Sequence, residues 1–594
     1  MDNEHESIWA HSIPWKQQVQ IIKRLFLFAK PFQWYFYFSI LFAAVVSVIN
    51  ILLPKIIQRF MDKYLAFGKA DELVIWFFAG LYFFGMLFKA LTQFGQTYLY
   101  SMGAEYMLED TRRILFRKLH SLGMRYFDQV PSGSILSRLT NDTMAFQNFW
   151  ELFSSLIVAV FAMVSAFIAM FITDHVIALW LLVFMPFLGV TIWYYQRYSS
   201  RVYRQMRERL SLLNNKLAES ITGINVIQDF RQERRINHEF EGVNGEYYQT
   251  RRAMIRVNSL LLSPIVNLFY ALGTVMILGF FGVRGLHAYV AAGVIYAFVT
   301  YLENFYNPLS RVMEIFSDFQ DGVVAGARVL RIMDDDTLAP HQNPGACAKV
   351  KFGKVEFRHV TFSYDGKHTI LQDVSFVAKP GQTIALVGQT GSGKTSIINV
   401  LMRFYEFGTG EILIDDRDIR DYPLAELRAK MGLVLQEPYM FYGTITSNIR
   451  MFNQNISDHQ VQRAAKFVNA DRFIEQLPGR YNAKVIERGA SYSTGQKQLI
   501  AFARTVATDP KILILDEATS SIDTETEKMI QDGLAKIEQG RTTIAIAHRL
   551  STIQNANQIL VLNQGKIVER GTNDELMQQH GFYYDMIQKQ NAEH

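Results

Sequence analysis

The sequence contains few of the residues that build disulfide frameworks and metal centres. It has one cysteine, Cys347, in 594 residues, so no disulfide can form within the chain. No group of cysteine and histidine residues has the spacing of a zinc site. A reducing compartment fits this composition. The net charge of +5 is small for this length and much of the basic excess lies between apolar segments, which argues against a nucleic-acid-binding protein.

The sequence also lacks a cleavable signal and an internal repeat. The residues before Pro31 include several charged ones and contain no apolar core of about 7–15 residues. The first apolar span is therefore expected to direct membrane insertion itself. Neither half repeats with the period of a solenoid, and a chain of this length is expected to hold several domains.

Charge is absent from long windows of the first half, although charged residues make up 19% of the chain. A helix needs about 20 apolar residues to cross the hydrocarbon core of a membrane. Windows of this kind run over 34–53, 73–100 (interrupted by Lys89), 152–173, 176–195, 257–283 and 286–302. The sequence therefore predicts an all-α transmembrane domain with six spans. Lys89 and Glu303 are the charges placed most deeply, and such charges usually face a cavity or a partner; helix packing and snorkelling are the alternatives.

The charge of the connecting loops predicts the orientation. Lysine and arginine gather before the first span, between the second and third, and between the fourth and fifth, as in cytoplasmic loops. Both termini are therefore expected on the cytoplasmic side. The outer links are short, with Asp174 and His175 after the third span and Arg284 and Gly285 after the fifth. The long inner connections keep a helical apolar periodicity, which favours helices that continue into the cytoplasm over separate soluble inserts.

A linker and an α/β domain follow the last span. The stretch "DDDTLAPHQNPGACAK" gathers acidic residues, proline, glycine and small residues, as linkers do. Beyond it, β-rich runs such as "KVEFRHVTFSY", "TIALVG", "KILILD" and "TTIAIAH" alternate with helical patterns, which is typical of an α/β domain. We expect a transmembrane domain over 1–333, a linker over 334–350 and an α/β nucleotide-binding domain over 351–594.

The segment "GQTGSGKTS" carries the strongest chemical signal. It follows the strand-like "TIALV", precedes a helical pattern and matches the phosphate-loop motif G-x-x-x-x-G-K-[ST]. Its residues are Gly388, Gln389, Thr390, Gly391, Ser392, Gly393, Lys394, Thr395 and Ser396. The glycines permit a tight path that directs N–H groups at phosphates, Lys394 reaches the β and γ oxygens, and the Thr395 hydroxyl suits Mg²⁺. A nucleoside triphosphate is expected to bind here.

Four more polar residues follow apolar strands. Asp516 and Glu517 in "KILILDEATSSID" come at the carboxyl end of a buried strand, where ligands bind in such sheets. Asp516 is expected to hold Mg²⁺ through water, and Glu517 to act as the general base that orients the attacking water. His548 in "AIAHRL" suits a contact with the γ-phosphate, and the Gln436 amide in "GLVLQEP" suits Mg²⁺ or water. Each of these signals is weak alone and gains weight from the phosphate loop.

The order and spacing of these motifs resemble the ATP-binding cassette (ABC) family. The resemblance is carried by Tyr364 in "FSYDG", the phosphate loop, Gln436, "STGQKQL", "LILDEATSSID" and His548. The six spans with long inner loops resemble an exporter half-transporter of that family. "RYFDQVPSGSILSRLTNDT" and "ESITGINVIQDFRQE" also look like its inner-loop motifs, so the resemblance covers nearly the whole chain.

The resemblance implies ATP and Mg²⁺ as cofactors and assigns further roles. Tyr364 would stack on adenine, Gln436 would link the γ-phosphate site to the membrane domain, and His548 would be the switch histidine. Short helices around 124–129 and 223–230 would press on the nucleotide-binding domains.

The segment "SYSTGQ" is similar to the signature motif of the family, LSGGQ. In the family this motif caps the nucleotide held by a second domain, which assigns that contact to Ser493, Gly495 and Gln496. One chain has one phosphate loop and one signature. Two chains, with twelve spans, are therefore expected to meet head to tail around two ATP molecules.

The signature departs from the family pattern at two positions. Thr494 stands in place of the first glycine and Tyr492 in place of leucine. A β-branched residue restricts the backbone and crowds an approaching anion, so the site under this signature is expected to hydrolyse ATP poorly. Because Glu517 and His548 are intact, we expect a different partner chain that has an intact signature and a degenerate catalytic site. This division resembles bacterial heterodimeric multidrug exporters, and a homodimer that tolerates the threonine is the alternative.

The spans are rich in Phe, Tyr, Trp and Met, which suits an adaptable apolar pocket for amphipathic drugs or lipids. Most of these residues are nevertheless expected to pack helices or face lipid. A homodimeric lipid or peptide exporter, a membrane-anchored ATPase and a gated channel are alternatives, and the long inner levers favour transport.

Overall fold

A computed structural model describes residues 14–592 apart from 262, 452, 517–523 and 547–552. The chain divides into two compact units, and each is described by itself. The helical unit comprises Met1–His120 and Ser132–Asp335, and the α/β unit comprises Ser121–Pro131 and Asp336–His594.

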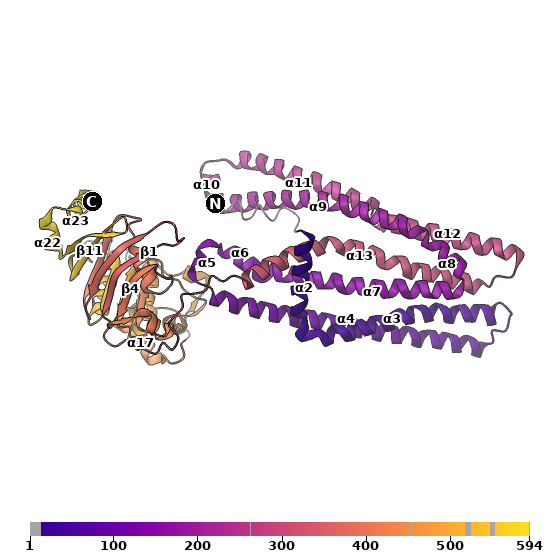
Figure 1. Ribbon diagram of the computed structural model, residues 1–594, viewed down its shortest axis with the longest axis horizontal. Helices are drawn as coiled ribbons and strands as arrows, with labels where there is room; N and C mark the ends of the chain where they lie inside the picture. The colour runs from indigo at the N-terminus through magenta and orange to yellow at the C-terminus, as the bar shows by residue number, and fades with distance from the viewer. Residues whose placement is uncertain (1–13, 262, 452, 517–523, 547–552, 593–594) are drawn as a thin grey trace. The chain divides into compact units, whose positions relative to one another are not determined.

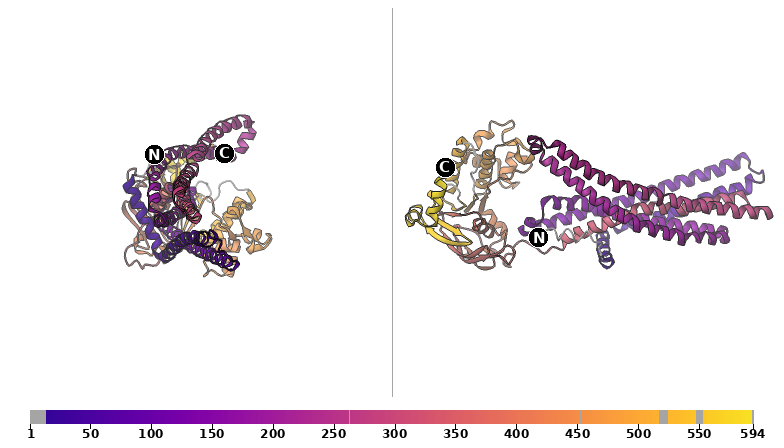
Figure 2. Two further views of the ribbon diagram at one scale, coloured as in Figure 1. Left: turned by 90° about the vertical axis from the view of Figure 1, so that its right-hand side faces the viewer. Right: turned by 90° about the horizontal axis from the view of Figure 1, so that it is seen from above.

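The helical unit consists of long helices joined by short turns. In chain order they are α2 (Trp15–Ala29), α3 (Gln33–Phe60), α4 (Glu72–Ser121), α6 (Ser132–Ser137), α7 (Thr143–Thr173), α8 (His175–Leu182), α9 (Phe184–Thr222), α10 (Ile224–Asp229), α11 (Glu233–Leu261), α12 (Ser263–His287) and α13 (Ala292–Met333). The helix α7 packs along α13, and α9 along α11 (Figure 1, Figure 2). Phe298 and Tyr301 of α13 are buried with Ile277 and Phe281 of α12, which gives this unit an apolar core.

Among the described residues, five helical stretches are long and apolar enough to cross a membrane. They are Lys16–Leu65, Glu72–Ser121, Ser132–Thr173, His175–Thr222 and Glu233–His287. Each contains one of the first five windows predicted from the sequence. The helix α13 holds most of the sixth window, but Glu303, Asn304 and Asn307 follow within the same helix and lower its apolar content. The sixth span therefore stays a prediction.

The connection before α13 lies later than expected. Arg284 and Gly285, predicted to link the fifth and sixth spans, are part of α12, which ends at His287. The link is formed by residues 288–291. The Arg284 guanidinium pairs with Asp174 at 2.6 Å, so its charge is paired at this end of the helix.

The long inner connections are helical, which confirms the prediction that membrane helices continue beyond the apolar windows. The helix α4 has 50 residues, or about 75 Å at 1.5 Å per residue, against a hydrocarbon core of about 30 Å. The short helices α5 (Met124–Gln129) and α10 lie where tip helices were expected.

The α/β unit is built on three sheets. Its strands are β1 (Val355–Phe362), β2 (Leu371–Ala378), β3 (Thr383–Gly388), β4 (Thr409–Ile414), β5 (Arg417–Asp418), β6 (Met431–Val434), β7 (Gly443–Thr444), β8 (Lys484–Val485), β9 (Ile512–Asp516), β10 (Thr542–Ile546), β11 (Gln558–Asn563) and β12 (Lys566–Gly571). The largest sheet has the order β12-β11-β3-β10-β9-β6 and is parallel except for β12. A four-stranded antiparallel sheet has the order β2-β1-β4-β5 (Figure 1).

Helices cover both faces of the largest sheet. The helices of this unit are α5, α14 (Lys394–Leu401), α15 (Leu424–Ala429), α16 (Ile445–Arg450), α17 (Asp458–Phe467), α18 (Asp471–Ile474), α19 (Thr494–Ala507), α20 (Thr524–Glu538), α22 (Asn573–Gln579) and α23 (Phe582–Ala592). Ile514 of β9 is buried in one core with Ile397 of α14. Leu515, the next residue, is buried in another core with Ile500 of α19. Since successive strand residues point to opposite faces, the α/β class predicted from the sequence is confirmed.

The stretch expected to be a linker is attached to the α/β unit. The Gln342 amide donates to the carbonyl oxygens of Ile419 and Tyr422 at 2.9 and 2.7 Å. The fully buried Arg403 donates to Gln342 at 3.2 Å, and Ala348 is buried in the adjoining core. In the same unit the Tyr405 hydroxyl donates to Asp128 of α5.

Candidate functional site

The phosphate loop connects β3 to α14, and its path requires glycine. A Cβ at Gly388 would overlap the carbonyl oxygen of Leu562 in the neighbouring strand β11. Gly393 has φ +104°, and a Cβ there would lie 2.8 Å from the Leu371 side chain. Gly391 also lies in the left-handed region, with φ +84°. A side chain at these positions would therefore displace the loop.

Lys394 begins α14 and is buried, with 7% of its surface exposed. Its Nζ donates to the carbonyl oxygens of Gly388 and Gln389 at 2.7 and 3.0 Å, which holds the ammonium over the loop. The Ser392 hydroxyl is buried and has no hydrogen-bond partner among the described residues, so it can donate to a phosphate oxygen. Thr395, in the first turn of α14, is exposed. These residues fit the phosphates of a nucleotide, which the N-terminus of α14 would also attract.

Tyr364 lies against the helix that follows the phosphate loop. Its hydroxyl lies 3.1 Å from the Ser396 hydroxyl and accepts a hydrogen bond from the Asn399 amide at 3.0 Å. Its ring meets that of Tyr405 edge-on, with centroids 4.8 Å apart. The next residue, Asp365, accepts from the backbone N–H of His368, and this bond holds the pKa of the Asp365 carboxyl well below its usual range. The structure therefore places Tyr364 beside the phosphate-loop helix, and stacking on adenine stays a prediction.

Two more predicted site residues, Asp516 and Gln436, lie at one edge of the largest sheet. Asp516 ends β9 and is aligned with Ile546 at the end of β10. On the other side of β9, Leu515 is aligned with Val434, two residues before the exposed Gln436. Since β3 leads into the phosphate loop on the far side of β10, the carboxyl ends of four parallel strands meet there. The predicted catalytic residues Glu517 and His548 lie outside the described residues.

The signature segment forms the capped start of α19. The Ser493 hydroxyl accepts from the backbone N–H of Gln496 at 3.2 Å, and the Gln496 side chain accepts from the N–H of Ser493 at 3.1 Å. Ser493 and Thr494 are exposed, whereas Gly495 is buried. Tyr492 is 8% exposed and donates to the Lys484 carbonyl oxygen at 3.3 Å, so it fills a core position.

Thr494 occupies an ordinary helical position. It is the first residue of α19, and its φ is not positive. Any residue adopts this conformation, so the expected restriction of the backbone has no support here. The crowding of an approaching phosphate by an exposed β-branched side chain remains a physical argument for poor hydrolysis.

Comparison with known proteins decides the family. Residues 36–309 match the ABC transporter transmembrane region, and residues 371–520 match the ABC transporter family. The chain is 44% identical over 577 residues to the ABC transporter ATP-binding protein exp8 of Streptococcus pneumoniae, covering 97% of this chain and 98% of that protein. The chain belongs to the ABC transporter family. Its helical and α/β units are therefore the transmembrane and nucleotide-binding parts of an ABC exporter.

Other ABC transporters are similar over most of this one. YheH of Bacillus subtilis, whose name refers to multidrug resistance, is 40% identical over 88% of this chain and 78% of its own length. A fatty acid ABC transporter of Mycobacterium bovis is 35% identical over 84% of this chain and 79% of its own length. A solved bacterial ABC exporter of the Atm1 family with ATP bound has a TM-score of 0.78 at 26% identity, covering 94% of this chain and 98% of that chain.

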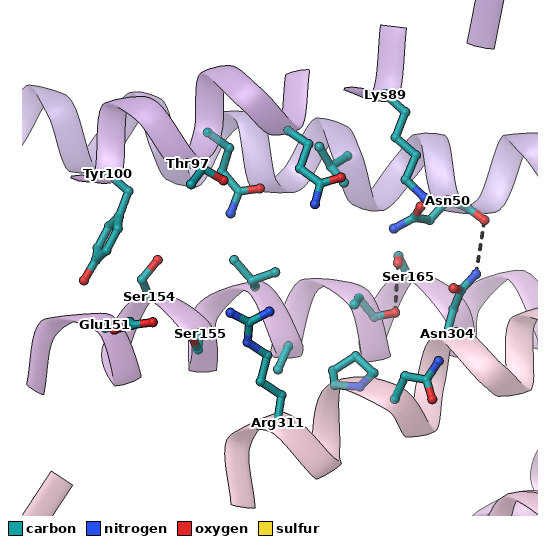
Figure 3. A pocket seen from close by; sticks show the side chains of 18 of the residues that line it. Asn50, Lys89, Thr97, Tyr100, Glu151, Ser154, Ser155, Ser165, Asn304 and Arg311 are labelled. Carbon is teal, nitrogen blue, oxygen red and sulfur yellow. Dashed lines mark hydrogen bonds between the residues drawn. The ribbon is translucent and has the colours of Figure 1, made fainter. Parts of the chain in front are cut away.

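The helical unit of this ABC exporter encloses a cavity of about 600 Å³ between α3, α4, α7 and α13 (Figure 3). Lys89 lines it, whereas Glu303 does not; the Glu303 carboxylate is exposed and accepts from the Asn307 amide at 3.4 Å. Most of the residues that line it carry polar side chains, and apolar residues complete the lining. Sequence reasoning singled out Lys89 but missed Gln93, Gln96 and Tyr100, which follow it at intervals of three or four positions and so share its face of α4.

Proposed function

We propose that this ABC exporter is one half of a heterodimer that uses ATP and Mg²⁺ to export amphipathic or hydrophobic compounds, drugs or lipids, across the cell membrane. ATP-driven transport is already established for this chain, because it is a membrane-spanning ABC exporter with an ATPase domain coupled to transport. Both termini lie in the cytoplasm in this proposal, on the strength of the basic inner loops. A homodimeric lipid or peptide exporter and an ATPase without transport are the alternatives.

The observation that carries the heterodimer is the contrast between an intact phosphate loop and an altered signature in one chain. The loop keeps its glycines and a buried Lys394. The exposed start of α19 carries Thr494, whose side chain narrows the space for a phosphate held by a second molecule. A partner with an intact signature would complete the site over Lys394. The partner's own nucleotide, capped by Ser493, would then lie in the poorly hydrolysing site.

The proposed role of each residue is based on its position in the phosphate loop, at the carboxyl ends of the parallel strands or in the signature segment. Lys394 and Ser392 bind phosphate oxygens, while Thr395, Gln436 and Asp516 hold Mg²⁺, which would neutralise phosphate charge. Glu517 orients the attacking water and His548 contacts the γ-phosphate. Tyr364 contacts adenine. The remaining phosphate-loop residues supply N–H donors, and Ser493, Gly495 and Gln496 cap the partner's nucleotide.

The substrate class draws support from the names of the relatives. One relative is named for multidrug resistance and another for fatty acid transport. Fatty acids are amphipathic, and many drugs are amphipathic or hydrophobic. An amphipathic or hydrophobic substrate is the chemistry that they share.

The transport part of the proposal is tested with sealed inverted membrane vesicles that contain this chain and a co-expressed second ABC half-transporter. We expect ATP-dependent uptake of a fluorescent amphiphile, and no uptake when Lys394 is replaced by alanine. ATPase activity without movement of any amphiphile tested would favour the rival ATPase. The partner is tested by purification: a stable complex with a different ABC half-transporter is expected, and a lone chain with full ATPase activity would favour a homodimer.

A further inference from the structure

Two cavities of different character adjoin each other in the helical unit. The polar cavity, of about 600 Å³, is the one described above. The aromatic cavity, of about 430 Å³, lies between α2, α3, α4 and α7. Tyr100 and Ser154 line both. Each volume is within the range of small-molecule sites, and the shared residues make one continuous site possible.

The aromatic cavity has walls of packed rings. Phe36 of α3 stacks on Trp150 of α7 with centroids 5.4 Å apart, and Phe26 of α2 meets Trp150 edge-on at 4.8 Å. Phe26 also meets Phe153 edge-on at 4.9 Å. These contacts hold the rings in place, so the cavity is a preformed apolar surface.

Two hydrogen-bond donors lie unused at this cavity. Trp150 is 3% exposed, and its indole N–H has no hydrogen-bond partner among the described residues. The Tyr100 hydroxyl is likewise buried without such a partner, and it points toward Ser154 and Glu151 (Figure 3). Buried donors without acceptors are costly and therefore rare, so an acceptor on a ligand at this boundary would stabilise the site.

The polar cavity has an excess of positive charge. Lys89 and Arg311 line it together with one acidic residue, Glu151. None of the three forms an ion pair with another described residue. In Figure 3, Arg311 reaches up between α7 and α4, and Lys89 lies toward the end away from Tyr100. An anionic or zwitterionic group is therefore favoured over a purely cationic one.

The aromatic cavity also lies at a membrane border in the proposed orientation. Phe36 is near the start of the first apolar window, Tyr100 ends the second and Trp150 precedes the third. All three positions are on the predicted cytoplasmic side of their spans. The rings therefore lie at the level of the inner leaflet in this orientation.

We propose that the two cavities form one site for an acyl amphiphile. The acyl chain lies among Phe26, Phe36 and Phe153, and an ester or amide oxygen accepts hydrogen bonds from Trp150 and Tyr100. The anionic or zwitterionic head lies in the polar cavity near Arg311 and Lys89. This inference rests on the proposed export function and narrows its substrate to acyl lipids and related acylated compounds.

The test uses the full chain with its partner in phosphatidylcholine nanodiscs without nucleotide. The probe is a single-chain acyl glycerophosphate with a diazirine at the end of its chain. We expect light-dependent labelling of α2 and α7 that unlabelled acyl glycerophosphate competes away. Trp150→Phe keeps an aromatic ring at this position but removes the indole N–H donor, so we expect about tenfold weaker labelling. Phe94→Ala is the matched control, because Phe94 is 68% exposed on α4 and lines neither cavity.

A second variant tests the head group without touching the aromatic walls. Arg311→Gln should weaken labelling by the acyl glycerophosphate about tenfold and leave labelling by the matching neutral acyl glycerol unchanged. Three results would each overturn the proposal. The first is labelling outside α2 and α7, and the second is equal labelling of Trp150→Phe and the parent at matched amounts of assembled complex. The third is stronger labelling by a matching alkylammonium probe.

Failure of this inference is distinguishable from failure of the proposed function. ATP-driven uptake of a fluorescent amphiphile by inverted vesicles is measured with the same preparations. Uptake without labelling of α2 and α7 would refute the acyl site alone. Labelling of these helices with no uptake of any compound would refute export and leave the site standing as a lipid-binding site.

Discussion

The phosphate loop and the signature segment both place small residues before a helix, yet they differ in how completely each is built. In the loop, a Cβ at Gly388 would strike the Leu562 carbonyl and Lys394 is buried over the loop carbonyls. In the signature, Ser493 and Gln496 satisfy each other's backbone groups, and Thr494 lies exposed in ordinary helical geometry. The loop therefore has the backbone path and the buried cation that an anion site requires.

In the proposed arrangement, the signature acts only together with a second chain. Its exposed residues would contact a phosphate held by that chain, whereas the phosphate loop has its own buried cation. The same chain can thus contribute an intact phosphate loop to one composite nucleotide site and an altered signature to the other. An asymmetric pair of sites follows if the partner has the opposite arrangement.

The largest loss of ATPase activity is expected when the cation of the phosphate loop is removed. Lys394→Ala in the complex should lower ATPase activity at least about 100-fold, because the β and γ oxygens lose their buried positive charge. Lys379→Ala is the matched control, since Lys379 is exposed and lies before β3. Steady-state phosphate release measures both, and retained activity in Lys394→Ala would contradict the role given to the loop.

A second substitution separates binding from hydrolysis at the same site. Glu517→Gln keeps the shape of the side chain but removes the base, so turnover should fall about 10²–10³-fold while ATP affinity stays within about twofold. Binding of a fluorescent ATP analogue and phosphate release are measured on one preparation. Near-normal turnover would remove Glu517 from the proposed catalytic role.

A third set of substitutions sharpens the asymmetry. In the complex, Ser493→Ala and Thr494→Gly should change ATPase activity by no more than about threefold, because the site that they cap contributes little hydrolysis. The matching serine-to-alanine change in the partner's signature should cost about tenfold or more. Equal losses from the two signatures would show that both sites hydrolyse ATP and would sink the asymmetric account.

A smaller effect is expected at Glu538, in the helix that packs against α19. Burial raises the pKa of Glu538, at the end of α20, to about 7. The folded chain therefore keeps a proton that the unfolded chain loses, and stability falls as pH rises from about 4.5 to about 7. Glu538→Gln should raise the thermal midpoint of the complex at pH 8 by about 2 °C and leave it unchanged at pH 4.5. An increase of equal size at both pH values would contradict the assigned cause.

Much of this fold could be predicted from the sequence because local patterns determine it. The helical periodicity between apolar windows extends through α4, α9, α11 and α13 in the structure. The phosphate loop was recognisable because a strand, a glycine pattern and a helix occur together. The placement of Asp516 and Gln436 at one sheet edge follows from parallel strands whose ends carry them.

Other features depend on contacts between distant residues and could not be predicted. Arg284 pairs with Asp174, 110 residues earlier, and no local pattern in the sequence indicates this ion pair. Hydropathy places Lys89 and Glu303 at similar depth, but only the packing of α4 and α13 decides that the first lines a cavity and the second does not. Composition likewise could not reveal that polar residues of α3, α4, α7 and α13 line one cavity.

Trapping of nucleotide by vanadate in the purified complex tests the asymmetric pair of sites most directly. Radiolabelled ADP trapped after turnover is counted per complex, and photolabelling then shows which phosphate loop holds it. We predict one trapped nucleotide per complex, held by the loop that contains Lys394. Two trapped nucleotides per complex, or full trapping by this chain alone as a homodimer, would contradict the account.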